Sequence, residues 1–204
     1  MYPGRGPTAA LGPVNGVLQD LFTNKPVRKF LYRTRYLFAA GAIVPVAGLM
    51  QVERLPAALG ISLVGQAIQS WCFASLVKNR ELSVRGPYLL VRNPMYLGRF
   101  FLILGFVVLL DGAWAIGVYA ILYYPYMLYR VKREERRLAR AYGEEFARYC
   151  AEVRRFLPSL RKIGDPRVWF FDRGMFLENH GHWNILLTLA AFVAVHALHI
   201  LVFD

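Results

Sequence analysis

The feature that most constrains the fold is a series of apolar runs, each near the length of a membrane-spanning helix. The runs lie at about Tyr36–Gln51, Leu55–Val77, Pro94–Leu110, Ala113–Tyr129 and Trp183–Phe203. A helix needs roughly 20 residues to cross the hydrocarbon of a bilayer, so the shorter runs would tilt or thin the membrane locally. We therefore predict an all-α, polytopic helical bundle in the membrane, with about five transmembrane helices.

Basic residues are concentrated in some of the connections between these runs. The chain holds 25 Lys and Arg against 13 Asp and Glu, although 56% of its residues are hydrophobic. Most of the positive charge lies before the first run, between the second and third, and between the fourth and fifth. The positive-inside rule therefore places these connections and the N-terminus in the cytoplasm, and Asp204 on the opposite side. Since this charge flanks apolar runs, a membrane surface is the expected partner and nucleic acid is not.

The cysteines and histidines form no pattern typical of a metal site. Cys72 lies in an apolar run and Cys150 in a charged segment, a spacing that suggests neither a zinc site nor a disulfide framework. His196 and His199 share a helix face, but no second pair of ligands accompanies them in the other runs. We predict no bound metal.

We expect three regions along the chain. Residues 1–35 are a cytoplasmic lead-in, 36–158 a membrane core, and 159–204 a C-terminal extension with one additional transmembrane helix. Within the core, residues Arg130–Arg155 are predicted to form a cytoplasmic amphipathic helix, because apolar side chains recur at helical spacing. This stripe comprises Leu138, Tyr142, Phe146, Tyr149, Val153 and Phe156, and Glu134 falls on it one turn before Leu138.

The start of the third run is a candidate anion site. Asn93 suits the N-cap of a helix and Pro94 its first position, so the amides that follow are free to bind an anion. Arg92 and Arg99 could add guanidinium groups that bind a carboxylate or phosphate. The alternative is that Asn93 and Pro94 only begin the helix and that Arg99 reaches the headgroups.

Glu134 and Glu135 follow the fourth run directly. Their carboxylates could accept hydrogen bonds from a ribose diol or stabilise a cation, or could pair only with the neighbouring basic residues. Tyr119, Tyr123 and Tyr126 lie on one helix face that leads toward Glu134. They could form a pocket wall whose rings favour a ligand cation, or could be ordinary interfacial aromatics.

These motifs, in this order, resemble the isoprenylcysteine carboxyl methyltransferases, to which the phospholipid N-methyltransferases look related. The resemblance covers about Leu63–Pro158. It rests on Gly-Pro-Tyr at 86–88, Arg-Asn-Pro-Met-Tyr-Leu-Gly at 92–98, Glu-Glu at 134–135, Tyr-Gly at 142–143 and Val-x-Arg-Phe-Leu-Pro at 153–158. It implies a helical membrane enzyme that binds S-adenosylmethionine at the cytoplasmic face and admits a lipid-like acceptor from the bilayer.

The resemblance also implies roles for particular residues. It places Arg155 near the polar head of the acceptor or at the pocket's edge, completing it. With Tyr123 from the tyrosine face described above, Arg155 is our candidate catalytic residue. The family often has His where this chain has Asn93, and often Tyr in place of Phe146. The cofactor-binding residues would be Tyr88, Arg92, Asn93, Pro94, Tyr96, Gly98, Glu134 and Glu135.

The function expected from these features is S-adenosylmethionine-dependent methyl transfer to a lipidic acceptor. Asn93 cannot act as a base, and a carboxylate acceptor needs none, so carboxyl O-methylation is slightly favoured over headgroup N-methylation. Two alternatives stay open. One is an NADPH-dependent membrane reductase resembling the sterol reductases, and the other is a non-enzymatic membrane protein that retains the fold.

Overall fold

The computed structural model describes residues 48–77 and 81–203, without the side chains of the last two, and within these ranges the chain is helical with no strand. The α-helices are α3 (Leu55–Ser75), α4 (Pro94–Val108), α5 (Trp114–Glu152), α6 (Arg173–Glu178) and α7 (Gly181–Phe203). Short 3-10 helices are η1 (Val52–Arg54), η2 (Gly86–Leu89), η3 (Leu160–Lys162) and η4 (Pro166–Trp169). The prediction of an all-α fold is confirmed for this part of the chain. The predicted lead-in and most of the first apolar run lie outside the described residues.

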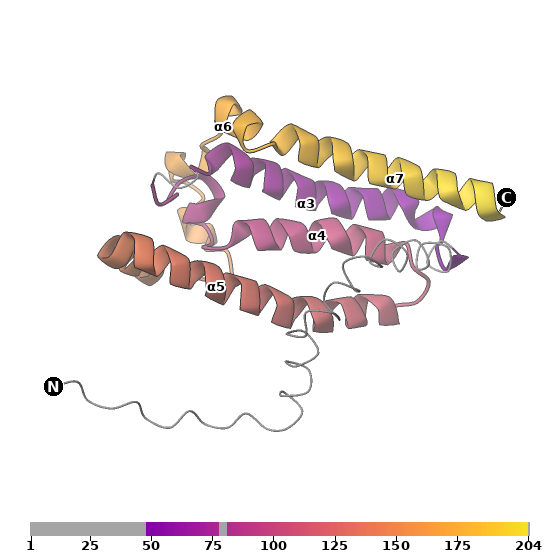
Figure 1. Ribbon diagram of the computed structural model, residues 1–204, viewed down its shortest axis with the longest axis horizontal. Helices are drawn as coiled ribbons and strands as arrows, with labels where there is room; N and C mark the ends of the chain where they lie inside the picture. The colour runs from indigo at the N-terminus through magenta and orange to yellow at the C-terminus, as the bar shows by residue number, and fades with distance from the viewer. Residues whose placement is uncertain (1–47, 78–80, 204) are drawn as a thin grey trace, which may run out of the picture. The chain divides into compact units, whose positions relative to one another are not determined.

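The four long helices lie side by side in the order α7, α3, α4 and α5 (Figure 1). Among the described residues, two helical segments are long and apolar enough to cross a membrane, Val52–Ser75 and Gly181–Leu201. Pro94–Val108 is apolar but shorter. The total of about five transmembrane helices therefore stays a prediction.

Small residues let α3 and α4 approach closely. A Cβ atom added to Gly98 would lie 3.0 Å from the carbonyl oxygen of Gly65 and 2.8 Å from Cγ of Gln69. Ser62 donates a hydrogen bond from Oγ to the carbonyl of Leu102 at 2.8 Å. Small side chains and serine hydroxyls at such contacts are typical of helix pairs in membranes. This contact fixes the N-terminal end of α4 against α3.

A polar contact and an aromatic contact attach α7 to the other helices. Thr188 donates a hydrogen bond to Oε1 of Gln66 on α3 at 2.9 Å, and both residues are buried. Phe192 stacks on Phe106 of α4, with ring centroids 4.2 Å apart. Few other residues of α7 are buried inside the protein, and about half of its described side chains are exposed. A surface of this kind suits contact with lipid.

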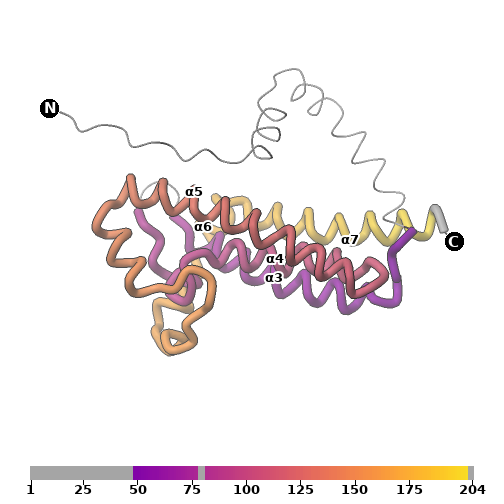
Figure 2. The backbone as a smooth tube through the Cα atoms, turned by 90° about the horizontal axis from the view of Figure 1, so that it is seen from below, coloured from indigo at the N-terminus to yellow at the C-terminus, as the bar shows by residue number. Residues whose placement is uncertain are grey.

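The structure corrects the expected form of the segment Arg130–Arg155. This segment is not a separate helix, because α5 begins at Trp114 and runs through the fourth apolar run into the charged region without a break. The helix is then interrupted at Gly143, whose φ of 46° and ψ of −117° are not helical. Only glycine adopts such a conformation readily. Figure 2 shows the tube bending back near the end of α5.

This bend changes how the predicted apolar stripe is used. Phe146, Tyr149 and Val153, which follow the bend, cluster with Leu82 from the connection after α3. Leu138 and Tyr142 precede the bend and pack against the same cluster. The residues of the stripe therefore pack against one another in a small core. A straight helix would instead have presented the stripe to the membrane surface.

Candidate functional site

A pocket of about 610 Å³ lies where the C-terminal end of α3, η2, the start of α4 and the middle of α5 meet. This volume is in the range of pockets that bind small molecules and cofactors. Its lining consists of Leu76, Val77, Glu81, Leu82, Ser83, Tyr88, Arg92, Asn93, Pro94, Met95, Tyr96, Arg99, Arg130, Glu134, Arg137, Leu138, Ala141, Tyr142 and Tyr149. The pocket thus contains six of the predicted site residues: Tyr88, Arg92, Asn93, Pro94, Tyr96 and Glu134.

The start of α4 forms one side of the pocket. Pro94 occupies the first turn, as predicted, and Asn93 is the N-cap residue by position. Its side chain makes no capping hydrogen bond, however. The Nδ2 group of Asn93 instead donates to the carbonyl oxygen of Arg155 at 3.3 Å and to Oε1 of Glu135 at 3.4 Å. Asn93 therefore connects the start of α4 to α5 and to the segment that follows it.

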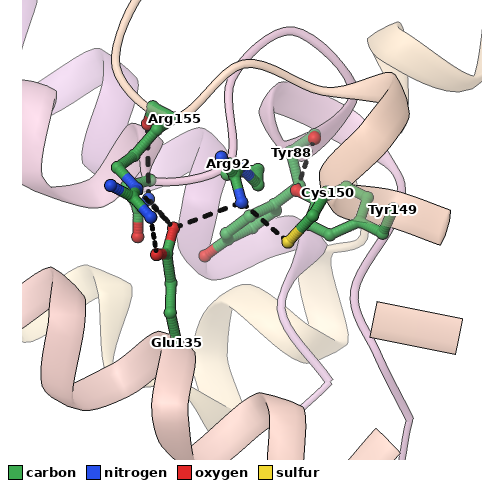
Figure 3. Close-up of polar contacts among 7 residues, drawn as sticks. Tyr88, Arg92, Glu135, Tyr149, Cys150 and Arg155 are labelled. Carbon is green, nitrogen blue, oxygen red and sulfur yellow. Dashed lines mark hydrogen bonds and ion pairs between the residues drawn. The ribbon is translucent and has the colours of Figure 1, made fainter. Parts of the chain in front are cut away.

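Glu135 is the centre of an ion-pair network beside the pocket. Figure 3 shows its carboxylate between the guanidinium groups of Arg155 and Arg92. Arg155 contacts both carboxylate oxygens, at 3.1 Å from Nε and 2.7 Å from Nη2, and Nη1 of Arg92 lies 3.5 Å away. The same Nη1 donates to Sγ of Cys150 at 2.7 Å. The Glu135 side chain is only 11% exposed, so these contacts compensate a desolvated charge.

Glu134 has different surroundings from its neighbour. It is exposed and lines the pocket, where Oε2 accepts a hydrogen bond from the Tyr96 hydroxyl at 3.1 Å. Glu135 is not among the lining residues. The sequence predicted the same role for both carboxylates, whereas the structure gives them different surroundings. Glu134 is available to a ligand, whereas Glu135 holds the surrounding chain segments together.

The pocket carries more positive than negative charge. It is lined by four arginines, Arg92, Arg99, Arg130 and Arg137, and by two glutamates, Glu81 and Glu134. Arg92 pairs with Glu135, and Glu81 pairs with Arg85. In the part of the chain that the structure describes, no carboxylate lies within ion-pair distance of the other three arginines. Arg99 lies over the Tyr96 ring and Arg130 is in hydrogen-bond contact with the Tyr96 side chain. The pocket therefore offers three guanidinium groups without a carboxylate partner among the described residues, and one carboxylate, Glu134, that is in no ion pair there.

Two further tyrosines, Tyr88 and Tyr149, line the pocket and contact each other's segments. Tyr149 donates from its hydroxyl to the carbonyl oxygen of Tyr88 at 2.7 Å, so the segment after the bend in α5 contacts η2 (Figure 3). Burial raises the pKa of both phenols, and the charge of Glu134 adds to the effect at Tyr88. Both side chains therefore remain neutral at physiological pH, where they supply ring surface and hydrogen bonds.

Four of the predicted site residues lie around the pocket without lining it: Gly98, Tyr123, Glu135 and Arg155. Gly98 is at the contact of α4 with α3. Tyr123 is buried and donates to the carbonyl oxygen of Tyr96 at 2.6 Å, and its ring lies between those of Tyr119 and Tyr126. Arg155 is bound to Glu135. Their assignment to catalysis or cofactor binding stays a prediction.

Sequence reasoning missed one wall of the pocket. Leu76, Val77, Leu82 and Ser83 come from the end of α3 and the connection after it. This connection contains no recognisable motif, and only the fold brings it to the pocket. Arg137 was also missed, although its position three residues after Glu134 places both on one face of α5.

Taken together, the fold and site define a class: membrane-associated helical proteins with a charged pocket at the ends of their apolar helices. Residues 58–145 match the family model described as phospholipid methyltransferase. This match supports the predicted resemblance to the superfamily of isoprenylcysteine carboxyl and phospholipid methyltransferases. A nicotinamide-dependent reductase is not favoured by this match.

One curated relative shares part of the chain. The cobalt-zinc-cadmium resistance protein CzcN of Cupriavidus metallidurans is 33% identical over 128 residues, which cover 59% of this chain and 56% of that protein. The chain thus spans little more than half of that relative. No solved structure matches the chain.

Proposed function

We propose that this protein transfers a methyl group from S-adenosylmethionine to a membrane-partitioned acceptor that carries a carboxylate. The observation that carries the proposal is the pocket itself. It lies largely within the segment that matches a methyltransferase family, and it combines the carboxylate of Glu134 with aromatic rings and with arginines that lack a carboxylate partner among the described residues. S-adenosylmethionine would supply an activated methyl group on a positively charged sulfur.

The lining residues fit the different parts of S-adenosylmethionine. The rings of Tyr88 and Tyr96 can lie against a cationic sulfonium, which aromatic faces attract. Glu134 is exposed and can accept hydrogen bonds from the ribose hydroxyls or from the amino group of the methionine moiety. An arginine on the same face of α5, Arg130 or Arg137, can bind the carboxylate of that moiety.

The charge of the pocket supports an acidic acceptor. Three arginines without a carboxylate partner among the described residues exceed what one cofactor carboxylate needs, so a second anionic group would find a guanidinium partner. An ammonium acceptor would gain no ion pair from these guanidinium groups. A carboxylate is already deprotonated at neutral pH, and its oxygen can attack a methyl carbon without a base. The chain then needs only to align the two molecules and exclude water.

The membrane supplies the route for such an acceptor. The pocket lies at the ends of α3 and α4, whose apolar surfaces continue away from it. A lipid chain could therefore remain in the bilayer while its polar head enters the pocket. We propose that this end faces the cytoplasm, where the positive-inside rule places the basic connections.

The direct test is ligand binding to the purified full chain in detergent, measured by isothermal titration calorimetry. We expect binding of S-adenosylhomocysteine and none of NADPH. Glu134→Gln should weaken that binding at least about tenfold, in line with loss of a charge-assisted hydrogen bond. Glu144→Gln, an exposed carboxylate of α5 outside the pocket, is the matched control. NADPH binding, or no binding of either molecule, would refute the proposal.

A further inference from the structure

The segment that follows the matched region closes over the C-terminal end of α3. The last carbonyl groups of a helix have no partner within the helix and need one from elsewhere. Asn179, at the end of α6, donates from Nδ2 to the carbonyl oxygens of Phe73 and Leu76, both at 2.8 Å. The backbone N–H of Asp172 donates to the carbonyl of Ala74 at 3.1 Å. These partners lie about a hundred residues later in the chain than the groups they bind.

Phe170 provides the next set of contacts with the same end of α3. Its carbonyl oxygen accepts hydrogen bonds from Nε1 of Trp71 and from Oγ of Ser75, each at 3.1 Å. The ring of Trp169 stacks on that of Trp71, with centroids 5.8 Å apart. The guanidinium of Arg85 lies over the ring of Phe170 at 4.4 Å. The segment thus contacts both α3 and the turn that begins η2.

The C-terminal end of α3 and the 3-10 helix η2 both contribute residues to the lining of the pocket. Leu76 and Val77, at the end of α3, are lining residues, and so is Tyr88 of η2. The N–H of Val77 also donates to Oγ of Ser83 at 3.0 Å, which joins two further parts of the same wall. Asn179 itself is 7% exposed and does not line the pocket. Asn179 can therefore affect a ligand only indirectly, by holding the end of α3 that lines the pocket.

We propose that Asn179 is a positioning residue for the pocket, and that the contacts of Trp169, Phe170 and Asn179 with α3 set the affinity for S-adenosylmethionine. This inference rests on the proposed function. The predicted C-terminal extension, residues 159–204, thereby gains a role in the site, although it lies outside the matched segment 58–145. The end of α3 stays in place because the amide of Asn179 binds two carbonyls of its last turn.

The test compares the full-length wild type with Asn179→Ala and Thr188→Val in detergent. Thr188→Val is the matched control, because it removes a buried hydrogen bond between the extension and α3 away from the end of that helix. The measurements are the Kd of S-adenosylhomocysteine and the rise in melting temperature that saturating ligand causes. A merely structural residue would change the melting temperature with and without ligand equally.

We expect Asn179→Ala to raise the Kd about tenfold and to reduce the ligand-induced rise in melting temperature. Thr188→Val should lower the melting temperature while leaving the Kd unchanged. If the wild type binds and Asn179→Ala binds equally well, the positioning role is refuted and the proposed function stands. If the wild type does not bind, the proposed function fails and this inference falls with it.

A second variant decides the question if Asn179→Ala does not fold. Trp169 is 65% exposed, so Trp169→Leu removes the stacking on Trp71 with little risk to the core. A raised Kd in this variant supports the proposal, and an unchanged Kd overturns it.

Discussion

Glu135 and Arg155 form a two-point ion pair across the bend in α5. The guanidinium approaches one carboxylate oxygen at 3.1 Å from Nε and the other at 2.7 Å from Nη2. Since the residues are 20 positions apart, the pair fixes the returning segment against the helix that precedes the bend. The neighbouring Glu134 faces the pocket and takes no part in this pair. Adjacent carboxylates therefore have separable roles, which can be tested by mutation.

Glu135→Gln should destabilise the protein, because it leaves Arg92 and Arg155 around a side chain without charge. We expect a loss of about 2 kcal/mol in the free energy of unfolding, the order found when one member of a partly buried pair is removed. Glu134→Gln should leave stability almost unchanged while weakening ligand binding. Thermal unfolding in detergent with calorimetric titration distinguishes the two. If both substitutions changed stability equally, the separate roles of Glu134 and Glu135 would be contradicted.

Gly143→Ala should destabilise the bend. A residue with a side chain is strained at a φ of 46°, although no neighbouring atom would clash with the new methyl group. We expect a loss of about 1 kcal/mol. Gly117→Ala in the same helix has open space and no positive φ, so it should be neutral or slightly stabilising. The unfolding midpoints of the two variants, measured side by side, check the prediction.

Gly98→Val should separate α4 from α3. The added Cβ alone would lie 3.0 Å from the Gly65 carbonyl and 3.1 Å from the backbone nitrogen of Gln69, and backbone atoms cannot move aside easily. We expect a loss of at least about 2 kcal/mol, typical of overpacked interiors. Gly60→Ala, on α3 with open space around it, is the control and should remain folded. A well-folded Gly98→Val variant with wild-type stability would show that this contact is looser than the structure indicates.

Alkaline pH should weaken the contact between Tyr149 and η2. Burial raises the pKa of Tyr149 above that of the unfolded chain. The stability it contributes is therefore complete below the ordinary tyrosine pKa of about 10, and is lost as pH rises toward the folded-state pKa. Tyr149→Phe lacks the hydrogen bond to Tyr88 and should lose about 1 kcal/mol at neutral pH.

The same variant provides the control for the pH dependence. Between about pH 9 and pH 11, we expect the unfolding midpoint of Tyr149→Phe to fall less steeply than that of the wild type. Tyr129→Phe, at a tyrosine that is 65% exposed, should follow the wild type. Parallel curves for wild type and Tyr149→Phe would rule out this tyrosine as a source of the alkaline loss.

Local sequence signals predicted the helices well. The apolar runs at Leu55–Val77 and Pro94–Leu110 became α3 and α4, because apolar length and a proline at the first turn are properties of the segment itself. The turn at Asp111 and Gly112 also formed, with a φ of 96° at the glycine. The break at Gly143 was not predicted. A periodic stripe on both sides of it is equally compatible with a straight helix and with two helices packed around one core.

The sequence predicted those site residues that are close together in the chain. It predicted less well the residues that only the fold brings together. Arg92, Asn93 and Tyr96 occupy one turn at the start of α4, and all three line the pocket. The expected place of Arg155, near an acceptor, depended on contacts that no local pattern encodes. Its actual partner, Glu135, became available only because the chain reverses at Gly143. The contacts of Asn179 are longer in range and were not foreseen at all.

The capping of α3 by Asn179 has a consequence for the order in which the protein is made. Synthesis proceeds from the N-terminus, and domains tend to fold as their residues emerge. The carbonyls of Phe73 and Leu76 receive this partner only after 103 to 106 further residues have been added. A nascent chain that already contains Arg92, Glu134 and Tyr149 therefore still lacks the contact that holds one pocket wall. The end of α3 that lines the pocket therefore gains this partner only when synthesis has passed α6.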